Sequence, residues 1–150
     1  AIVIALTISP SDVAHAARTR RVKLFFVALN DNGKSGRGIG CGDSIIPVRH
    51  GVSPTSTPLT SALKSLLAIR YYGSSRLYNV LSYSRLTVRS VGMSRGTATV
   101  RLAGQLVLGG VCDNPRIEAQ FKETIHQFPA VRRSRIFING VRLEDVLSGR

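Results

Sequence analysis

The sequence predicts an α+β fold, in which two helices pack on one face of a mixed sheet and the element order is β-β-α-β-β-α-β. Three observations support this prediction. Residues 22–29 form a nearly continuous apolar run, residues 86–91 and 97–102 alternate between apolar and polar types, and two segments combine a cap residue, a proline and an apolar stripe at helical spacing. A chain of 150 residues suits one domain, which we place at residues 22–150.

The first part of the domain reads as two strands joined by a glycine-rich loop. Residues 22–29 predict a strand that is mostly buried on both faces, and residues 44–49 predict a second, shorter strand. Between them, residues 30–42 contain five glycines, which favours a loop. Residues 50–57 read as a polar link that leads into the first helix.

Thr57 and Pro58 predict the start of that helix, because Thr is a favourable N-cap and Pro is tolerated at the first helical position. Gly73, which follows Tyr72, predicts its end. The apolar stripe between these signals consists of Leu59, Ala62, Leu63, Leu66 and Leu67. Residues 73–84 then read as an irregular stretch, whose apolar side chains we expect beneath the sheet: Leu77, Tyr78, Val80 and Leu81.

Residues 86–91 and 97–102 predict a β-hairpin with residues 92–96 between its strands. These five residues also match Gly-x-Ser-x-Gly, the pattern around the nucleophile of many hydrolases, with Ser94 at the nucleophile position. That arrangement needs a helix after the serine, whereas an alternating strand pattern follows here. We therefore interpret the two glycines as hairpin-turn residues and keep a Ser94 hydrolase only as a third hypothesis.

Asn114 and Pro115 predict the start of the second helix by the same cap-and-proline device, and Pro129 predicts its end. The apolar stripe of this helix consists of Ile117, Phe121, Ile125 and Phe128. A strand at residues 131–138, a tight turn at Asn139 and Gly140, and a short tail strand or turn at residues 141–147 complete the predicted fold.

The beginning of the chain has features of a secretory signal peptide. Residues 1–8 are apolar apart from Thr7, a polar break follows, and Ala14 and Ala16 flank His15 in a small-x-small cleavage pattern. We expect residues 1–16 to be the remnant of such a peptide, cleaved after Ala16, with residues 17–21 as a basic linker. The alternative is a buried N-terminal strand. A signal peptide implies a secreted or extracytoplasmic protein, so the cell envelope is the expected location.

Two cysteines, Cys41 and Cys112, are compatible with a disulfide in an exported protein. Two free buried thiols are the alternative, and the long separation excludes a Cys-x-x-C motif. If the bridge forms, it brings Asp43 close to Asp113. These two carboxylates could then hold a cation, although a role for Asp113 and Asn114 in capping the second helix is the simpler interpretation.

Other candidates for catalysis or cofactor binding are weak. Residues 28–35 end in Gly-Lys-Ser like a phosphate-binding loop, but Ala28 replaces the first glycine and the glycine-rich residues that follow cannot begin a stable helix. His50 and His126 have no accompanying cluster of ligands or acids in the sequence. We therefore expect no catalytic residue, no metal site and no cofactor.

The chain is strongly basic, with a formal net charge of +13, and 17 of its 21 basic residues are Arg. On the predicted hairpin and last strand several arginines occupy polar positions of alternating segments, so they could share one solvent-exposed face and bind anions. Aromatic residues fall mostly at core positions, which does not favour a single-stranded nucleic-acid binder. The arginines concerned are Arg85, Arg89, Arg95, Arg101, Arg132, Arg133 and Arg135. A generally basic surface without a dedicated ligand is the alternative.

The order of elements and several short segments resemble the GerMN domain of spore-germination and other exported bacterial proteins. Two segments resemble the family most specifically: Gln127-Phe-Pro-Ala-Val131, at the end of the second helix, and Ile136-Phe-Ile-Asn-Gly140, at the closing strand and turn. The glycine-rich insert and the two cysteines depart from the general pattern and would belong to an exported subgroup. The other matching segments are 22–29, 45–49, 58–67 and 96–102.

The resemblance implies an α+β module similar to ring-building motifs, which serves assembly in envelope and spore-associated complexes and carries no family catalytic residues. Our first functional hypothesis is accordingly a non-enzymatic, exported module that binds an envelope protein or associates with itself. The second is a binder of an anionic polymer, either a wall glycopolymer or a nucleic acid, through the arginines named above.

Overall fold

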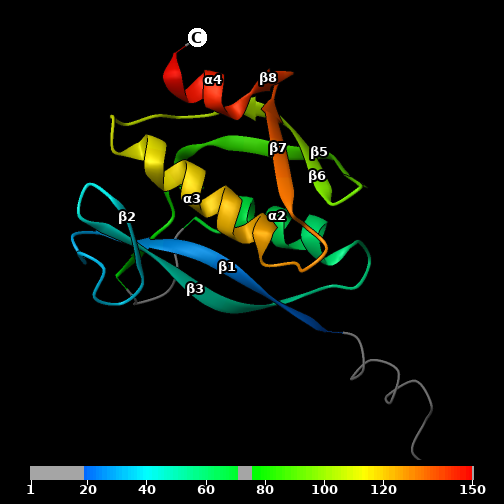
Figure 1. The fold of residues 1–150 in the computed structure, drawn as a ribbon, viewed down its shortest axis with the longest axis horizontal. Coiled ribbons are helices and arrows are strands. Elements are labelled where there is room, and N and C mark those ends of the chain that lie inside the picture. The colour runs from blue at the N-terminus through cyan, green and yellow to red at the C-terminus, as the bar shows by residue number, and fades with distance from the viewer. Residues whose placement is uncertain (1–18, 71–75, 150) are drawn as a thin grey trace, which may run out of the picture.

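The computed structural model describes residues 19–70 and 76–149. Its strands form two four-stranded sheets with helices between them (Figure 1). Sheet A has the order β2-β3-β1-β4 and is antiparallel, whereas sheet B has the order β5-β6-β7-β8 and contains the parallel pair β6–β7. The strands are β1 (Arg20–Ala28), β2 (Arg37–Gly40), β3 (Asp43–Val52), β4 (Leu77–Tyr78), β5 (Arg85–Ser94), β6 (Thr97–Gln105), β7 (Arg133–Ile138) and β8 (Val141–Arg142). The helices are α2 (Pro58–Ala68), α3 (Asp113–His126), α4 (Leu143–Ser148) and the 3-10 helix η1 (Val80–Tyr83).

The α+β class is confirmed, but the strands divide into two sheets instead of one. The division follows from what lies along the edge of β1 opposite β3. Gln127 exchanges two hydrogen bonds of 2.7 Å with the backbone of Lys23, and Gln120 Nε2 donates to the Phe25 carbonyl at 2.6 Å. Further along the same edge Val27 pairs with Tyr78 of β4. Side chains of α3 and the short strand β4 therefore occupy the edge that a strand of sheet B would need.

The larger of two hydrophobic clusters among the described residues joins the two sheets through the helices. Leu24 and Phe26 of β1 are fully buried, as are Leu63 of α2 and Phe121 of α3, and Val100 of β6 is buried in the same cluster. The inward-facing row of sheet B is completed by Ala98, Leu102, Ile136 and Ile138. Because this row uses every second residue of β6 and β7, the residues between them face away from the core.

A buried pair of amide side chains fixes the crossing from sheet A to sheet B. Asn79 Nδ2 donates to the carbonyls of Leu66 and Ile69 at the end of α2, at 2.9 and 2.7 Å. Gln120 Oε1 accepts from the Val80 N–H at 2.9 Å, and its Nε2 donates to Asn79 Oδ1 at 3.1 Å. These bonds hold η1, which delivers the chain into β5. The predicted burial of Val80 and Leu81 is confirmed.

Most expected boundaries hold, with differences at the ends. The predicted N-cap is confirmed, because Thr57 accepts a hydrogen bond from the Thr60 N–H at 3.3 Å, but α2 ends at Ala68. Tyr72 and Gly73, the expected helix end, lie outside the described residues. β1 begins at Arg20, so two residues of the expected 17–21 linker pair with β3. The expected signal-peptide remnant, residues 1–16, also lies outside the described residues.

Three further segments differ from expectation. The glycine-rich loop contains β2. Gly36, directly before this strand, packs closely against β3, because any Cβ at this position would lie 2.3 Å from the Ile45 carbonyl oxygen. The N-cap of α3 is Cys112, and Asn114 instead donates a hydrogen bond to the Leu147 carbonyl at 2.8 Å. Residues after β8 form α4 rather than a tail strand. The predicted Asn139–Gly140 turn is confirmed by positive φ angles of 50° and 82°.

Candidate anion-binding face

The outward face of sheet B carries three of the predicted arginines. β6 pairs in parallel with β7, so that Arg133 lies opposite Thr97, Arg135 opposite Thr99, and Arg101 opposite Phe137. All three arginines are exposed, whereas the residues between them on each strand point into the core or are half-buried. We call Arg101, Arg133 and Arg135 the arginine face.

Arg101 is held against an aromatic ring. Its guanidinium carbon lies 4.9 Å from the centroid of the Phe137 ring, which is a cation–π distance. This contact fixes the position of the charge above the sheet and leaves the guanidinium donors free to meet an anion. Phe137 lies in the predicted last strand, but no residue pattern indicates its contact with Arg101.

Two more of the predicted arginines lie at the end of the arginine face. The backbone N–H groups of Arg132 and Arg133 donate to the Gly96 carbonyl at 2.8 and 3.0 Å, which joins the β5–β6 turn to the start of β7. The guanidinium of Arg132 also donates to the Arg95 carbonyl at 3.3 Å. The structure therefore brings Arg95 and Arg132 next to Arg133.

The remaining two predicted arginines do not join this group. Arg85 pairs with Gln105 at the opposite end of the hairpin. Arg89 lies at an irregularity of β5, where Val88 pairs with Leu102 but Ser90 pairs with Arg101. Both are exposed on β5, which is the edge strand of sheet B.

In the part of the chain that the structure describes, no acidic side chain pairs with these arginines. Residues 85–105 and 131–142 contain no Asp or Glu. Among the described residues, the ion pairs of basic side chains are those of Arg37 with Glu123, Arg116 with Asp43 and Asp113, Lys122 with Glu118, and Arg142 with Glu144. The seven predicted arginines take part in none of them. A concentration of unpaired positive charge on one face attracts anions over distances of about 10 Å at moderate salt.

The predicted disulfide is confirmed, since the Sγ atoms of Cys41 and Cys112 are bonded and the two Cα atoms lie 5.9 Å apart. The expected proximity of Asp43 and Asp113 is also present, but a protein side chain occupies the space between them. Arg116 Nε donates to Asp43 Oδ2 at 2.6 Å, and its NH1 donates to Asp113 Oδ1 at 3.2 Å. The two carboxylates thus pair with a guanidinium, which removes the reason to expect a cation site there.

This cluster is a structural one. Burial acts against the charged form of Arg116, but the hydrogen bonds and charges of Asp43 and then Asp113 outweigh it and raise its pKa. Burial raises the pKa of the Tyr78 hydroxyl, whose ring lies 5.9 Å from the Arg116 guanidinium carbon. Arg116 is the residue that the sequence reasoning missed, and its spacing of three from Asp113 on a helix was the available signal.

The segment that looks like a phosphate loop is a compact turn instead. Asp31 Oδ2 accepts hydrogen bonds from the Ser35 N–H and from Ser44 Oγ, both at 2.7 Å. These and further bonds from Ser35 lower the pKa of Asp31 to about 2. The strand β2 follows, so the helix N-terminus that would bind a phosphate is replaced by a strand.

The Gly-x-Ser-x-Gly segment spans the end of β5 and the hairpin turn. Ser94 pairs with Thr97, while Arg95 and Gly96 form the turn with φ angles of 49° and 77°. Gly96 is therefore a turn residue as predicted. Gly92 is not, because it lies within β5 opposite Thr99. The strand β6 follows the turn, so the nucleophile-elbow geometry is not formed.

The two histidines lie apart from each other in the fold. His50 pairs with Val22 in sheet A. His126 is exposed at the end of α3, and its Nε2 lies 3.0 Å from Ser134 Oγ. In the described part of the chain no carboxylate contacts the other ring nitrogen of His126, so the pair lacks the group that orients the imidazole in hydrolytic triads. No group of three metal-ligating residues occurs there either.

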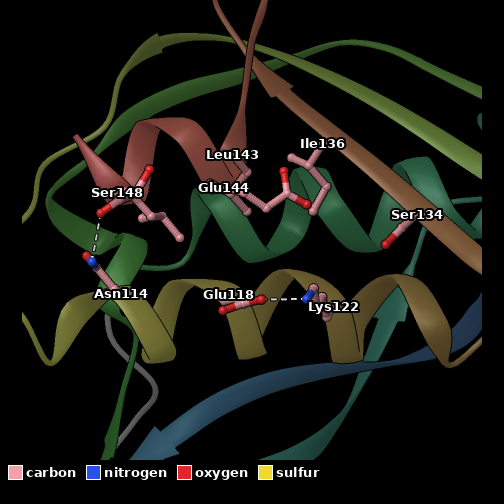
Figure 2. A pocket seen from close by; sticks show the side chains of 9 residues that line it. Asn114, Glu118, Lys122, Ser134, Ile136, Leu143, Glu144 and Ser148 are labelled. Atoms are coloured by element: carbon pink, nitrogen blue, oxygen red, sulfur yellow. Dashed lines mark hydrogen bonds and ion pairs between the residues drawn. The ribbon is translucent and has the colours of Figure 1, made fainter. Parts of the chain in front are cut away.

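A hollow of about 350 Å³ lies between α3, α4 and β7 (Figure 2). Ile136 and Leu143 line it with apolar surface, while the Glu118–Lys122 ion pair and Glu144 supply charges at its rim (Figure 2). The backbone N–H of Glu144 and then Arg142 hold the pKa of the Glu144 carboxyl below its usual range. A charged acid at the rim does not favour an anionic ligand. Ser134, which lies 3.0 Å from His126 Nε2, is part of the lining (Figure 2), but among the described residues no carboxylate orients that histidine.

Comparison with known proteins identifies the fold. No family model matches the chain, and no curated protein matches it in sequence. Among solved structures, the first GerMN domain of the sporulation protein GerM from Bacillus subtilis aligns with a TM-score of 0.60 and 16% identity, over 84% of this chain and 87% of that domain. The tandem GerMN domains of the same protein align with a TM-score of 0.59 and 12% identity, over 92% of this chain and 43% of theirs.

The chain therefore has the fold of a GerMN domain, as its sequence resemblance implied. It spans less than half the length of the tandem-domain structure. Among the described residues, no helix has the length and apolar character needed to cross a membrane.

Proposed function

We propose that this domain is an extracytoplasmic interaction module of the cell envelope that acts by binding a partner protein rather than by catalysis. Its GerMN-type fold is that of a sporulation protein, and its disulfide suits an oxidising compartment. The observation that carries the proposal is the arginine face, an exposed surface of sheet B with three arginines and no acid. Such a face is complementary to an acidic surface on a partner.

The proposal is tested by removing these charges without disturbing the core. In the triple variant Arg101→Gln, Arg133→Gln and Arg135→Gln, all three side chains are exposed, so the fold should persist. A matched control removes the same charge from sheet A, at Arg20, Arg21 and Arg49, which are also exposed.

Immobilised wild type and control should retain the same partner from an envelope extract, and the triple variant should lose it. Because surface charges act mainly on association, retention should also weaken as salt rises. Equal retention by all three proteins, or a strict monomer that retains nothing, would contradict the proposal.

A second candidate function is binding of an anionic polymer, such as a wall glycopolymer or a nucleic acid. The observation that favours it is the arrangement of arginines in a row, with Arg133 and Arg135 about 7 Å apart along β7 and Arg95 and Arg132 extending the row beyond its end. Such binding must weaken steeply with salt, by about one counterion for each phosphate neutralised. Heparin and DNA columns test this function with the wild type, the triple variant and the sheet A control, without any partner protein. If the domain binds such a polymer, the triple variant should elute at lower salt than the other two proteins.

A further inference from the structure

The edge strand β5 has one free side. It pairs with β6 alone, and among the described residues no backbone group of 85–94 makes a hydrogen bond to any other element. This differs from the edge of β1, where Gln120 of α3, Gln127 directly after that helix and the strand β4 satisfy the backbone. Unpaired N–H and C=O groups in a row form a template on which another strand can add.

A groove runs along this free edge. A hollow of about 260 Å³ is lined by Leu86, Thr87 and Val88 of β5 and by Lys64, Leu67 and Ala68 of α2. Neighbouring side chains of a strand point to opposite faces, so three consecutive residues line one hollow only when it follows the edge of the strand. The groove therefore presents backbone on one wall and a helix on the other.

The two faces of β5 differ in chemistry. On the inner face, Leu86 and Val88 line the groove and Met93, 47% exposed, continues the apolar row towards the turn. The outward positions are polar or basic, beginning with exposed Arg85. A strand added at this edge would accordingly meet apolar groups on its inward side and positive charge on its outward side.

The charges around the groove are all of one sign. Lys64, Arg85 and Arg89 are exposed beside it, and residues 58–70 and 85–105 contain no Asp or Glu. A second copy of this chain would bring like charges together if the two β5 edges met, which disfavours self-pairing. An extended segment with carboxylates on its outward side is complementary to the same charges.

We propose that β5 and α2 bind an extended acidic peptide by strand addition, in which the peptide pairs with Arg85–Val88 and alternates apolar residues towards the groove with acidic residues towards solvent. The irregularity at Arg89 marks the end of the regular pairing surface. This proposal shares with the proposed function only the premise that the domain works by binding. The peptide site lies on β5 and α2, on a surface separate from the arginine face.

The test uses a fluorescent, acetylated six-residue peptide of alternating Glu and Val, with binding to the full chain followed by anisotropy. Only every second residue of an added strand directs its backbone towards β5. N-methylation of one alternate set of amides should therefore abolish binding, and N-methylation of the other set should leave it unchanged. The modification is in the peptide, so the result does not depend on the folding of a protein variant.

Protein variants then locate the site. Lys64→Gln with Arg85→Gln and Arg89→Gln should weaken peptide binding by about tenfold or more, since three complementary charges are lost. The arginine-face triple variant should bind the peptide as the wild type does, so failure of the proposed function leaves this result intact. A peptide with Lys in place of Glu should not bind.

Several results would overturn the proposal. These are no binding of the alternating peptide, equal weakening by both N-methylated sets, or full affinity in the Lys64, Arg85 and Arg89 variant. A peptide-free dimer in light scattering, with residues 85–88 protected from hydrogen exchange, would also overturn it by assigning the edge to a second copy.

Discussion

Replacement of Gln120 by Leu tests how α3 holds the two sheets together. The Gln120 side chain is fully buried and serves two backbone groups, the Phe25 carbonyl at 2.6 Å and the Val80 N–H at 2.9 Å. The Phe25 carbonyl lies on the edge of β1 that faces α3, away from β3, so the β1–β3 ladder offers no replacement donor there. Asn79 Oδ1 keeps a partner, because it also accepts from the Leu81 N–H.

Each buried group left without a partner costs about 1–3 kcal/mol, and the added apolar contact of Leu recovers part of this. We therefore expect Gln120→Leu to lower the free energy of unfolding by about 3 kcal/mol and the Tm by about 12 °C. The measurement is urea denaturation followed by circular dichroism, with a thermal scan.

Gln127→Leu is the matched control. Gln127 lies directly after the same helix and also bonds the backbone of β1, at Lys23, but at the exposed end of the edge. Water can replace those bonds, so the loss should stay below about 1 kcal/mol. Equal stability of the two variants would refute the reasoning that buried glutamine bonds, rather than general packing, join α3 to sheet A.

The remaining predictions concern the disulfide, a surface carboxylate and a glycine. Removing the bridge with Cys41→Ser and Cys112→Ser should lower the free energy of unfolding by about 4 kcal/mol, because the bridge closes a loop with a sequence separation of 71. Urea denaturation without reductant measures this, and an unchanged midpoint would contradict it. Hydrogen bonds from Ser35 and Ser44 lower the pKa of Asp31 to about 2, so its stabilisation is complete above its ordinary pKa of 3.8 and is lost as pH falls through 2. Asp31→Asn should therefore be destabilised at pH 6 and match the wild type near pH 2, and a gap that is constant with pH would exclude this linkage. Gly104→Ala should lower the free energy of unfolding by about 3 kcal/mol, since φ is +123° and a Cβ would stand 1.9 Å from the Arg85 carbonyl oxygen. Gly92→Ala is the control and should be tolerated, because nothing lies near its Cβ position. Similar melting temperatures for the two variants would contradict this prediction.

Local features of this fold could be predicted from the sequence. The Thr57 N-cap, the turn at Asn139 and the hairpin turn at Gly96 depend on the conformations of a few neighbouring residues, and all three are confirmed. The apolar stripe of α3 is buried as predicted at Ile117, Phe121 and Ile125. The disulfide could be named because the described chain has two cysteines and no competing partner.

The arrangement of strands into two sheets could not be predicted in the same way. Strand patterns indicate which face is buried but not which strand lies alongside, since pairing joins residues far apart in the chain. The deciding residues here are Gln120 and Gln127, polar residues that read as the solvent side of a helix but bond to β1 across about a hundred residues.

The candidate site shows the same limit. Alternation placed Arg101 on the exposed face of its strand, and the pairing of β6 with β7 set Arg133 and Arg135 beside it. The sequence could not show that Arg85 and Arg89 lie apart from the arginine face. Their separation from it depends on the position of β5 at the edge of sheet B. The two carboxylates Asp43 and Asp113 also suggested a cation site, but Arg116, on the same helix as Asp113, pairs with both of them.

NMR tests most directly whether the arginine face of sheet B recognises acidic partners. The ¹⁵N-labelled chain is titrated with short poly-glutamate, and with poly-lysine of equal length as the control. Chemical-shift changes should concentrate on Thr97–Arg101 and Arg133–Phe137, should diminish as salt rises, and should be absent with poly-lysine. Changes confined to sheet A, or equal changes over the whole surface, would contradict the account.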